Sequence, residues 1–194
     1  MSGTSETAQL KQNVEEQLNR LLKQLAEIDE GYEDGELDEE EYDEMREETL
    51  EQLAEFQETL SSLMEGDMSL VDDLSAMKLA IQAAVSQAFQ TPEVIELFAK
   101  KQPDALRAKY EELETQLQLG KLTEASFNAK KLEMLAAILN LGGALTDGEK
   151  AYLQKNMNET LAQFQNAATN LSASANKDLL SGAASDIARA SGQS

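Results

Sequence analysis

Apolar residues recur every three or four positions along most of the chain, which is the spacing of one face of an α-helix. The densest stretch spans residues 69–103, and its apolar positions are Leu70, Leu74, Met77, Ile81, Ala84, Val85 and Phe89. Further alanines widen this face, so we expect a central helix with other helices around it. Pro92, which follows Thr91, and Pro103 each interrupt the pattern. They predict that one helix stops and another begins at each proline.

Two longer apolar seams precede this central stretch. The first comprises Val14, Leu18, Leu21, Leu25, Ile28 and Tyr32, and the second comprises Tyr42, Met45, Thr49, Leu53, Phe56, Leu60 and Leu63. A short acidic turn with two glycines, Gly31 and Gly35, joins them. Such a turn favours an intramolecular antiparallel hairpin. A parallel leucine zipper between two chains needs a longer uninterrupted heptad seam, and it is the alternative.

Together these patterns predict an all-α fold. The helices are expected near residues 6–29, 38–65, 69–90, 92–101, 104–118, 123–141 and 147–168. The expected organisation is an acidic coiled-coil-like helical hairpin (1–67), a central helical segment (68–119), a C-terminal helical unit (120–170) and a weakly structured tail rich in Ser, Ala and Gly (171–194).

The acidic turn also resembles a calcium-binding loop in part. Residues 30–41 match five positions of the EF-hand pattern, but Tyr32 stands where that loop needs a carboxylate. The same glycine, leucine and aromatic spacing recurs between Gly120 and Phe127 without an acidic cluster. The shared feature is therefore a glycine that ends one helix and a cap that opens the next. We expect hairpin geometry here and no metal.

Composition narrows the range of functions. The 194-residue chain has no cysteine and no histidine, which removes disulfides, thiolate nucleophiles, histidine bases and the usual zinc ligands. We therefore expect neither an enzyme nor a bound cofactor. The net charge is −21, and residues 1–67 hold 22 of the 37 acidic residues against four basic ones. This charge opposes nucleic acid and anionic membranes and favours basic protein surfaces.

Several expectations follow for location and assembly. No apolar run in the sequence is long enough to cross a bilayer, and the N-terminus lacks the apolar region of a signal peptide. We expect a cytoplasmic protein, small enough to be present in the nucleus as well, and a monomer or weak dimer. An acidic coiled-coil structural or chaperone-like protein that binds basic partners is one reading of the composition.

Two parts of the sequence resemble a known family. The first is LVDDLSAMKLAIQAAVSQAF followed by TPEVIELFAKKQP. The second is the spacing Phe127, Lys131-Leu132, Leu135, Leu141-Gly142, Leu145-Thr146, Glu149 and Tyr152-Leu153. Both resemble the β-catenin-interacting ICAT family, and in particular its members that join a leucine zipper to an ICAT domain. The likeness runs from about residue 10 to about residue 171.

This resemblance implies a function in Wnt signalling. In the family, a compact helical domain docks on the last armadillo repeats of β-catenin, and an acidic tail lies along the armadillo groove and competes with Tcf transcription factors. The resemblance implies that residues 120–170 form an ICAT-like helical domain of a non-enzymatic adaptor. Its partner would be β-catenin or another armadillo-repeat protein. The residues implied to bind that partner are Lys131, Tyr152 and Phe164.

The tail departs from the family pattern. The family's groove-binding segment combines an aspartate, two aliphatic residues, an aromatic residue and a glutamate. Here Asp178, Leu179 and Leu180 are present, but no aromatic residue follows Phe164 and no glutamate follows Glu159. We therefore expect this chain to share the helical hairpin of the family and not its groove-binding peptide.

Overall fold

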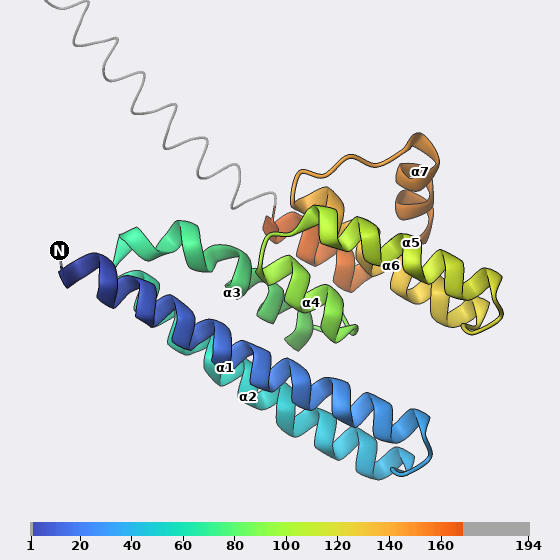
Figure 1. Ribbon diagram of the computed structural model, residues 1–194, viewed down its shortest axis with the longest axis horizontal. Coiled ribbons are helices and arrows are strands. Elements are labelled where there is room, and N and C mark those ends of the chain that lie inside the picture. Colours follow the sequence, from blue (N-terminus) through green and yellow to red (C-terminus); the bar gives the residue numbers. More distant parts are fainter. Residues whose placement is uncertain (1, 169–194) are drawn as a thin grey trace, which may run out of the picture.

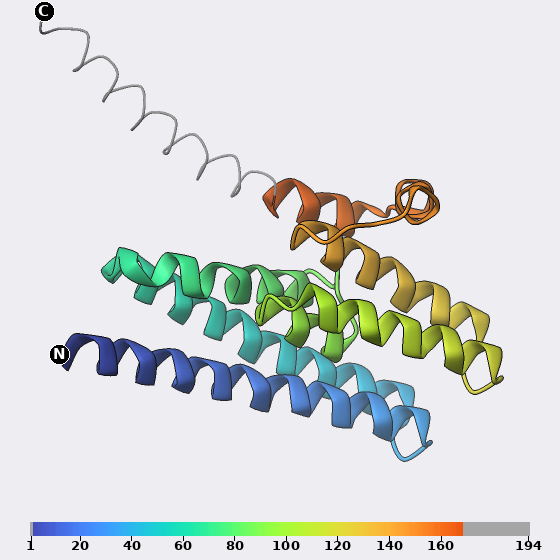
Figure 2. The same ribbon diagram turned by 45° about the horizontal axis from the view of Figure 1, so that its top comes forward.

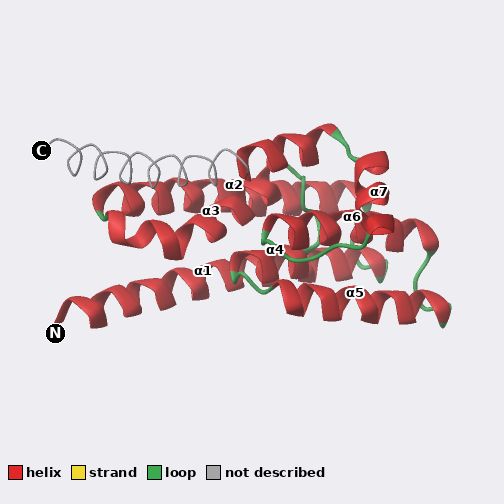
Figure 3. Cartoon of the chain, turned by 90° about the horizontal axis from the view of Figure 1, so that it is seen from above, coloured by secondary structure: helices red, strands yellow, loops and turns green. Residues whose placement is uncertain are grey.

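The structure, a computed structural model, describes residues 2–168, which form helices joined by short turns (Figures 1 and 3). The helices are α1 (Ser2–Glu33), α2 (Glu39–Gly66), the 3₁₀ turn η1 (Met68–Leu70), α3 (Val71–Val85), α4 (Pro92–Ala99), α5 (Pro103–Gln118), α6 (Glu124–Asn140) and α7 (Asp147–Asn156). Residues 159–168 are helical as well. No strand occurs between residues 2 and 168, and the predicted all-α fold is confirmed.

Helices α1 and α2 lie side by side as an antiparallel hairpin, as the sequence predicted (Figure 1). The acidic turn between them serves the two helix ends. Gly35 has a φ of +76°, and the N–H of Glu36 donates to the Gly31 carbonyl at 2.9 Å, so α1 ends in a left-handed glycine cap. Asp38 and Glu41 then form a reciprocal capping box that opens α2.

Helix α4 lies at the centre of the fold. It contacts α1 and α3 on one side and α5 and α6 on the other, so it separates the α1–α2 hairpin from the α5–α6 hairpin (Figure 2). Val94, Ile95 and Phe98 are buried along this short helix. The prediction of a helix that starts at Pro92 and of a restart at Pro103 is confirmed.

Three predicted helices differ from the observed ones. Helix α1 begins at Ser2 and not near residue 6. The helix expected over 69–90 is a 3₁₀ turn followed by α3, which ends at Val85 because Gln87 adopts a left-handed φ of 63°. The helix expected over 147–168 breaks after Asn156, since the side chain of Asn158 accepts from the N–H of Leu161 at 2.8 Å and caps a new helix.

One hydrophobic core joins the helices. Its buried residues run from Val14 in α1 to Ala168 at the end of the described chain. An aromatic cluster links distant segments, with ring centroids 5.7 Å apart for Phe89 and Phe98 and 4.7 Å apart for Phe89 and Phe164. Residues from all three expected helical units therefore contribute to the same core. The expected tail, residues 171–194, lies outside the described residues.

The turn between α6 and α7 offers a test of this packing. A Cβ on Gly143 would lie 2.6 Å from Cγ2 of Ile138 and 3.1 Å from the Ile138 carbonyl oxygen. Gly143→Ala should therefore lower the free energy of unfolding by about 1–3 kcal/mol, measured by urea denaturation. Gly148→Ala is the matched control, because a Cβ there meets only the Thr146 hydroxyl at 4.0 Å. It should leave stability unchanged or raise it, and equal losses for both variants would contradict the packing.

Candidate partner-binding surface

The sequence-predicted partner surface is formed by α6 and α7. The α5–α6 turn closes at Gly120, which has a φ of +71°, and the Thr123 hydroxyl then accepts from the N–H of Ser126 to open α6. Thr146 and Glu149 form the capping box that opens α7. These local signals fix where each helix starts, and hence which side chains of α6 and α7 meet.

Lys131 and Tyr152 come together across these two helices. The Nζ atom of Lys131 lies 4.1 Å from the centroid of the Tyr152 ring and 5.9 Å from that of Phe127. The Tyr152 hydroxyl donates to the Asn128 carbonyl at 3.4 Å. Lys131 and Tyr152 are half-buried, so part of each side chain remains accessible to a partner. The pair thus holds α7 against α6 through a cation–π contact and contributes to the surface.

Phe164, the third predicted residue, lies elsewhere. Its side chain is only 4% exposed, and its ring packs against Phe89 and Phe98, with a centroid distance of 5.5 Å to Phe98. It is therefore a core residue in the described structure, and its side chain is not exposed as a partner-binding residue would need to be. Phe164 belongs to the apolar face of the last helix. Its sequence position alone does not distinguish a core aromatic residue from one that binds a partner.

An ion pair anchors the start of α7 on α5. The guanidinium of Arg107 makes two contacts with the Glu149 carboxylate, at 2.6 and 3.2 Å, and also donates to the Ala144 carbonyl at 2.8 Å. The hydrogen bond from Arg107 holds the pKa of Glu149 below its ordinary value. Because Glu149 also caps α7, this fork couples the orientation of α7 to α5.

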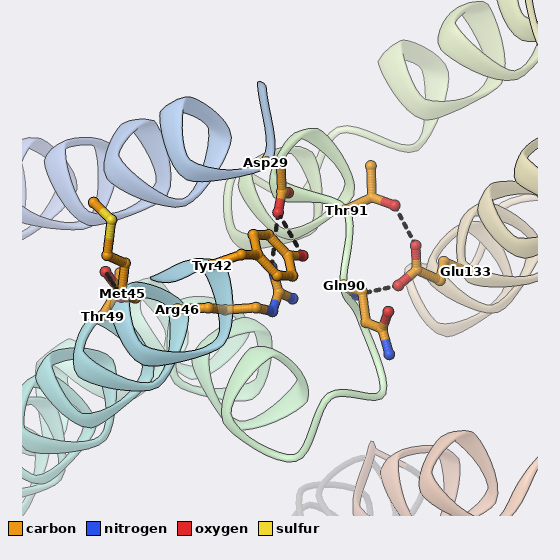
Figure 4. Close-up of polar contacts among 8 residues, drawn as sticks. All are labelled: Asp29, Tyr42, Met45, Arg46, Thr49, Gln90, Thr91 and Glu133. Carbon is orange, nitrogen blue, oxygen red and sulfur yellow. Dashed lines mark hydrogen bonds and ion pairs between the residues drawn. The ribbon is translucent and has the colours of Figure 1, made fainter. Parts of the chain in front are cut away.

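A buried carboxylate fastens α6 to the centre of the fold. Glu133 is 7% exposed, and its two oxygens accept from the N–H of Gln90 and the hydroxyl of Thr91 (Figure 4). Thr91 immediately precedes α4, so this contact links α6 to the α3–α4 connection. Burial raises the pKa of the Glu133 carboxyl, while the hydrogen bond from Thr91 opposes that rise. A buried carboxylate whose two oxygens both accept hydrogen bonds holds α6 against this connection. We call a polar contact that fixes one helix against another in this way a polar lock.

A second polar cluster joins α1 and α2 at the tip of their hairpin, next to the connecting turn. Arg46 donates to the Asp29 carboxylate at 3.1 Å, and the Tyr42 hydroxyl donates to the same oxygen at 3.0 Å (Figure 4). Burial raises the pKa of Asp29, and the charge of Arg46 counteracts it. Further from the turn, the buried Thr49 hydroxyl accepts from Gln24 at 2.6 Å and donates to the Met45 carbonyl at 3.1 Å.

Sequence reasoning missed Glu133 and Arg107. Glu133 left a visible signal, because it is an acidic residue flanked by Leu132 and Met134 at the start of a buried apolar run. A carboxylate in such a run must find hydrogen-bond donors. Arg107 left none, because its partner Glu149 is far away in the sequence and only the fold brings them together.

The structure therefore defines an all-helical protein whose α6–α7 surface is held in place by polar locks. Residues 113–190 match the family model described as beta-catenin-interacting protein ICAT, which confirms the resemblance to the ICAT family for this part of the chain. The match covers less than half of the chain, begins in α5 and extends into residues that the structure does not describe. It leaves the leucine-zipper part of the resemblance untested.

No solved structure matches the chain. The matched range includes Asp178, Leu179 and Leu180, which lie in the tail that was expected to depart from the family's groove-binding peptide. Within residues 2–168, no helix combines the length and apolar character needed to cross a membrane.

Removing the buried lock should destabilise the protein. Glu133→Ala leaves the Gln90 N–H and the Thr91 hydroxyl without their acceptor, which should cost about 3 kcal/mol of unfolding free energy in urea denaturation. Asn128→Ala, at an exposed position of the same helix, is the control and should cost less than about 0.5 kcal/mol. A Glu133→Ala protein as stable as its control would show that the lock contributes nothing.

The pH dependence of stability gives an independent test of the same carboxylate. Because folding raises the pKa of Glu133 above its ordinary value of 4.5, the folded state binds the proton more tightly than the unfolded state. Its contribution is fully present below pH 4.5 and is lost as the pH rises through the raised folded pKa. Between a pH below 4.5 and a pH above the raised pKa, the free energy of unfolding of the parent protein should fall, relative to that of Glu133→Gln, by about 1.4 kcal/mol for each unit by which folding raises the pKa. Parallel stability curves for the two proteins would contradict this assignment.

Proposed function

We propose that this protein is a non-enzymatic adaptor that binds β-catenin or another armadillo-repeat protein through α6 and α7. The observation that carries the proposal is the match of residues 113–190 to the beta-catenin-interacting ICAT family. The mechanism would be occupancy, in which the docked helical surface excludes a competing ligand from the armadillo protein. The proposal assumes a cytoplasmic protein with access to the nucleus.

The geometry of α6 and α7 supports this role. Lys131 and Tyr152 are both partly accessible and lie next to each other, so they offer a positive charge and an aromatic ring at one place. The Arg107–Glu149 fork and the Glu133 contacts fix the helices that carry this pair. A surface that is ordered before binding loses less conformational entropy when a partner docks.

The proposal also assigns a different role to each part of the chain. The acidic hairpin (1–67) and the central segment (68–119) would act as the support, and the ICAT-like unit (120–170) would carry the contact surface. The common core and the central position of α4 support this arrangement, because the contact surface rests on helices that are themselves packed against the hairpin.

Substitutions on α6 and α7 test the proposal. Lys131→Glu and Tyr152→Ala should each weaken binding of the full-length chain to a β-catenin armadillo domain by about tenfold or more, measured by isothermal titration calorimetry. The physical reason is that each variant removes one member of the accessible cation–aromatic pair. Circular dichroism should show unchanged helicity.

The matched control is Lys23→Glu, which makes the same charge change on α1, outside the family match. It should bind with the parent affinity. Equal weakening by Lys23→Glu would indicate a general charge effect, and parent-like affinity of both α6–α7 variants would place the contact elsewhere. Absence of binding by the parent chain would exclude β-catenin as the partner.

A further inference from the structure

A cleft of about 560 Å³ opens between the tip of the α1–α2 hairpin and the α5–α6 hairpin. One wall is the end of α1, with Glu30, Tyr32 and Glu33, and the opposite wall includes Lys109 of α5 and Lys130 of α6. The α3–α4 connection lines it as well. Its volume lies within the range of about 300–1,000 Å³ that is typical of ligand-binding sites.

The charges in this cleft divide into satisfied and available groups. Asp29 is paired with Arg46 at 3.1 Å, and Glu93 is paired with Lys109 at 3.2 Å. Among the described residues, no ion pair engages the remaining charged groups of the lining, which are Glu30, Glu33 and Lys130. Two carboxylates on α1 and one ammonium group on α6 thus line the cleft outside any of these ion pairs.

An aromatic surface accompanies the two carboxylates. Tyr32 stacks on Tyr42 with ring centroids 4.4 Å apart and an interplanar angle of 26°, yet its side chain is still 43% exposed. The stack is held in place because the Tyr42 hydroxyl donates to Asp29. A large aromatic ring that is fixed and exposed in a cleft provides a face that attracts cations.

We propose that this cleft binds an arginine-bearing basic segment of a partner protein, with a guanidinium on Tyr32 and in reach of Glu30 and Glu33. These two carboxylates are three residues apart in α1 and therefore lie on one face of the helix. A guanidinium stacks on an aromatic ring while it donates two parallel hydrogen bonds to a carboxylate, which an ammonium group does not do. Lys130, on the opposite wall, directs the positive group towards α1.

The net charge of the hairpin reinforces this choice of partner. Residues 1–67 carry 22 acidic and four basic residues, so the field around α1 attracts a basic segment before it enters the cleft. The groups proposed to contact the guanidinium, Glu30, Tyr32 and Glu33, lie in α1 and outside the family match, whereas Lys130 on the opposite wall lies within it. It does not depend on the proposed function of α6 and α7.

The test uses the full-length chain and fluorescence anisotropy with three labelled peptides of equal length. Alanine alternates with arginine in the first, with lysine in the second and with glutamate in the third. The arginine peptide should bind most tightly and the glutamate peptide least. Tyr32→Leu should weaken the arginine peptide by about three- to tenfold, and should reduce its preference over the lysine peptide.

A pair of matched double variants separates the cleft from general electrostatics. Glu30→Gln with Glu33→Gln removes the two available carboxylates, and Glu44→Gln with Glu47→Gln removes two exposed carboxylates of α2 with the same spacing, outside the cleft lining. The first pair should weaken the arginine peptide by about fivefold or more, and the second by less than about twofold.

Equal losses for the two pairs, or tighter binding of the glutamate peptide, would overturn the proposal. Equal affinity of the arginine and lysine peptides would remove the role of Tyr32. If Tyr32→Leu loses helicity, the two double variants decide the question alone, because all four of their positions are exposed.

Discussion

Helix α4 and the four helices that bury it stabilise one another. This eight-residue helix contacts α1, α3, α5 and α6, and Val94 and Ile95 have no exposed surface. A helix this short is not stable in water by itself, so it forms only because its neighbours enclose it. Those neighbours in turn bury their apolar faces against α4. The N-terminal hairpin and the ICAT-like helices are consequently parts of one core and not separate bodies on a linker.

Polar locks decide which way the helices face around this core. Hydrophobic burial is largely non-directional, whereas the two oxygens of Glu133 and the fork of Arg107 accept only a narrow set of geometries. Glu133 sets α6 relative to the start of α4, and Arg107 sets α7 relative to α5. These contacts hold the helices that carry the Lys131–Tyr152 pair, and the pair therefore has a defined position on packed helices.

Local signals in the sequence predicted most of the fold. The capping boxes at Asp38 and Thr146 and the proline starts at Pro92 and Pro103 act over a few residues, so their positions can be seen without the tertiary structure. The early end of α3 at Val85 could not be predicted in this way, because Gln87 carries the left-handed conformation that usually marks a glycine.

The candidate surface was predictable only in part. Lys131 and Tyr152 were named from the family resemblance, and the structure brings them into contact. Phe164 was named with them but is enclosed by Phe89 and Phe98, and apolar periodicity alone does not distinguish an anchor for a partner from a core residue. The Arg107–Glu149 fork depends on residues distant in sequence, and no local pattern reveals it.

We propose that a partner docks on α6 and α7 while the acidic hairpin supports these helices. Hydrogen–deuterium exchange of the full-length chain, with and without a β-catenin armadillo domain, would locate the contact. Exchange should become slower in peptides from α6 and α7 and stay unchanged in the exposed turn between α1 and α2. Protection confined to the α1–α2 hairpin, with α6 and α7 unchanged, would contradict it.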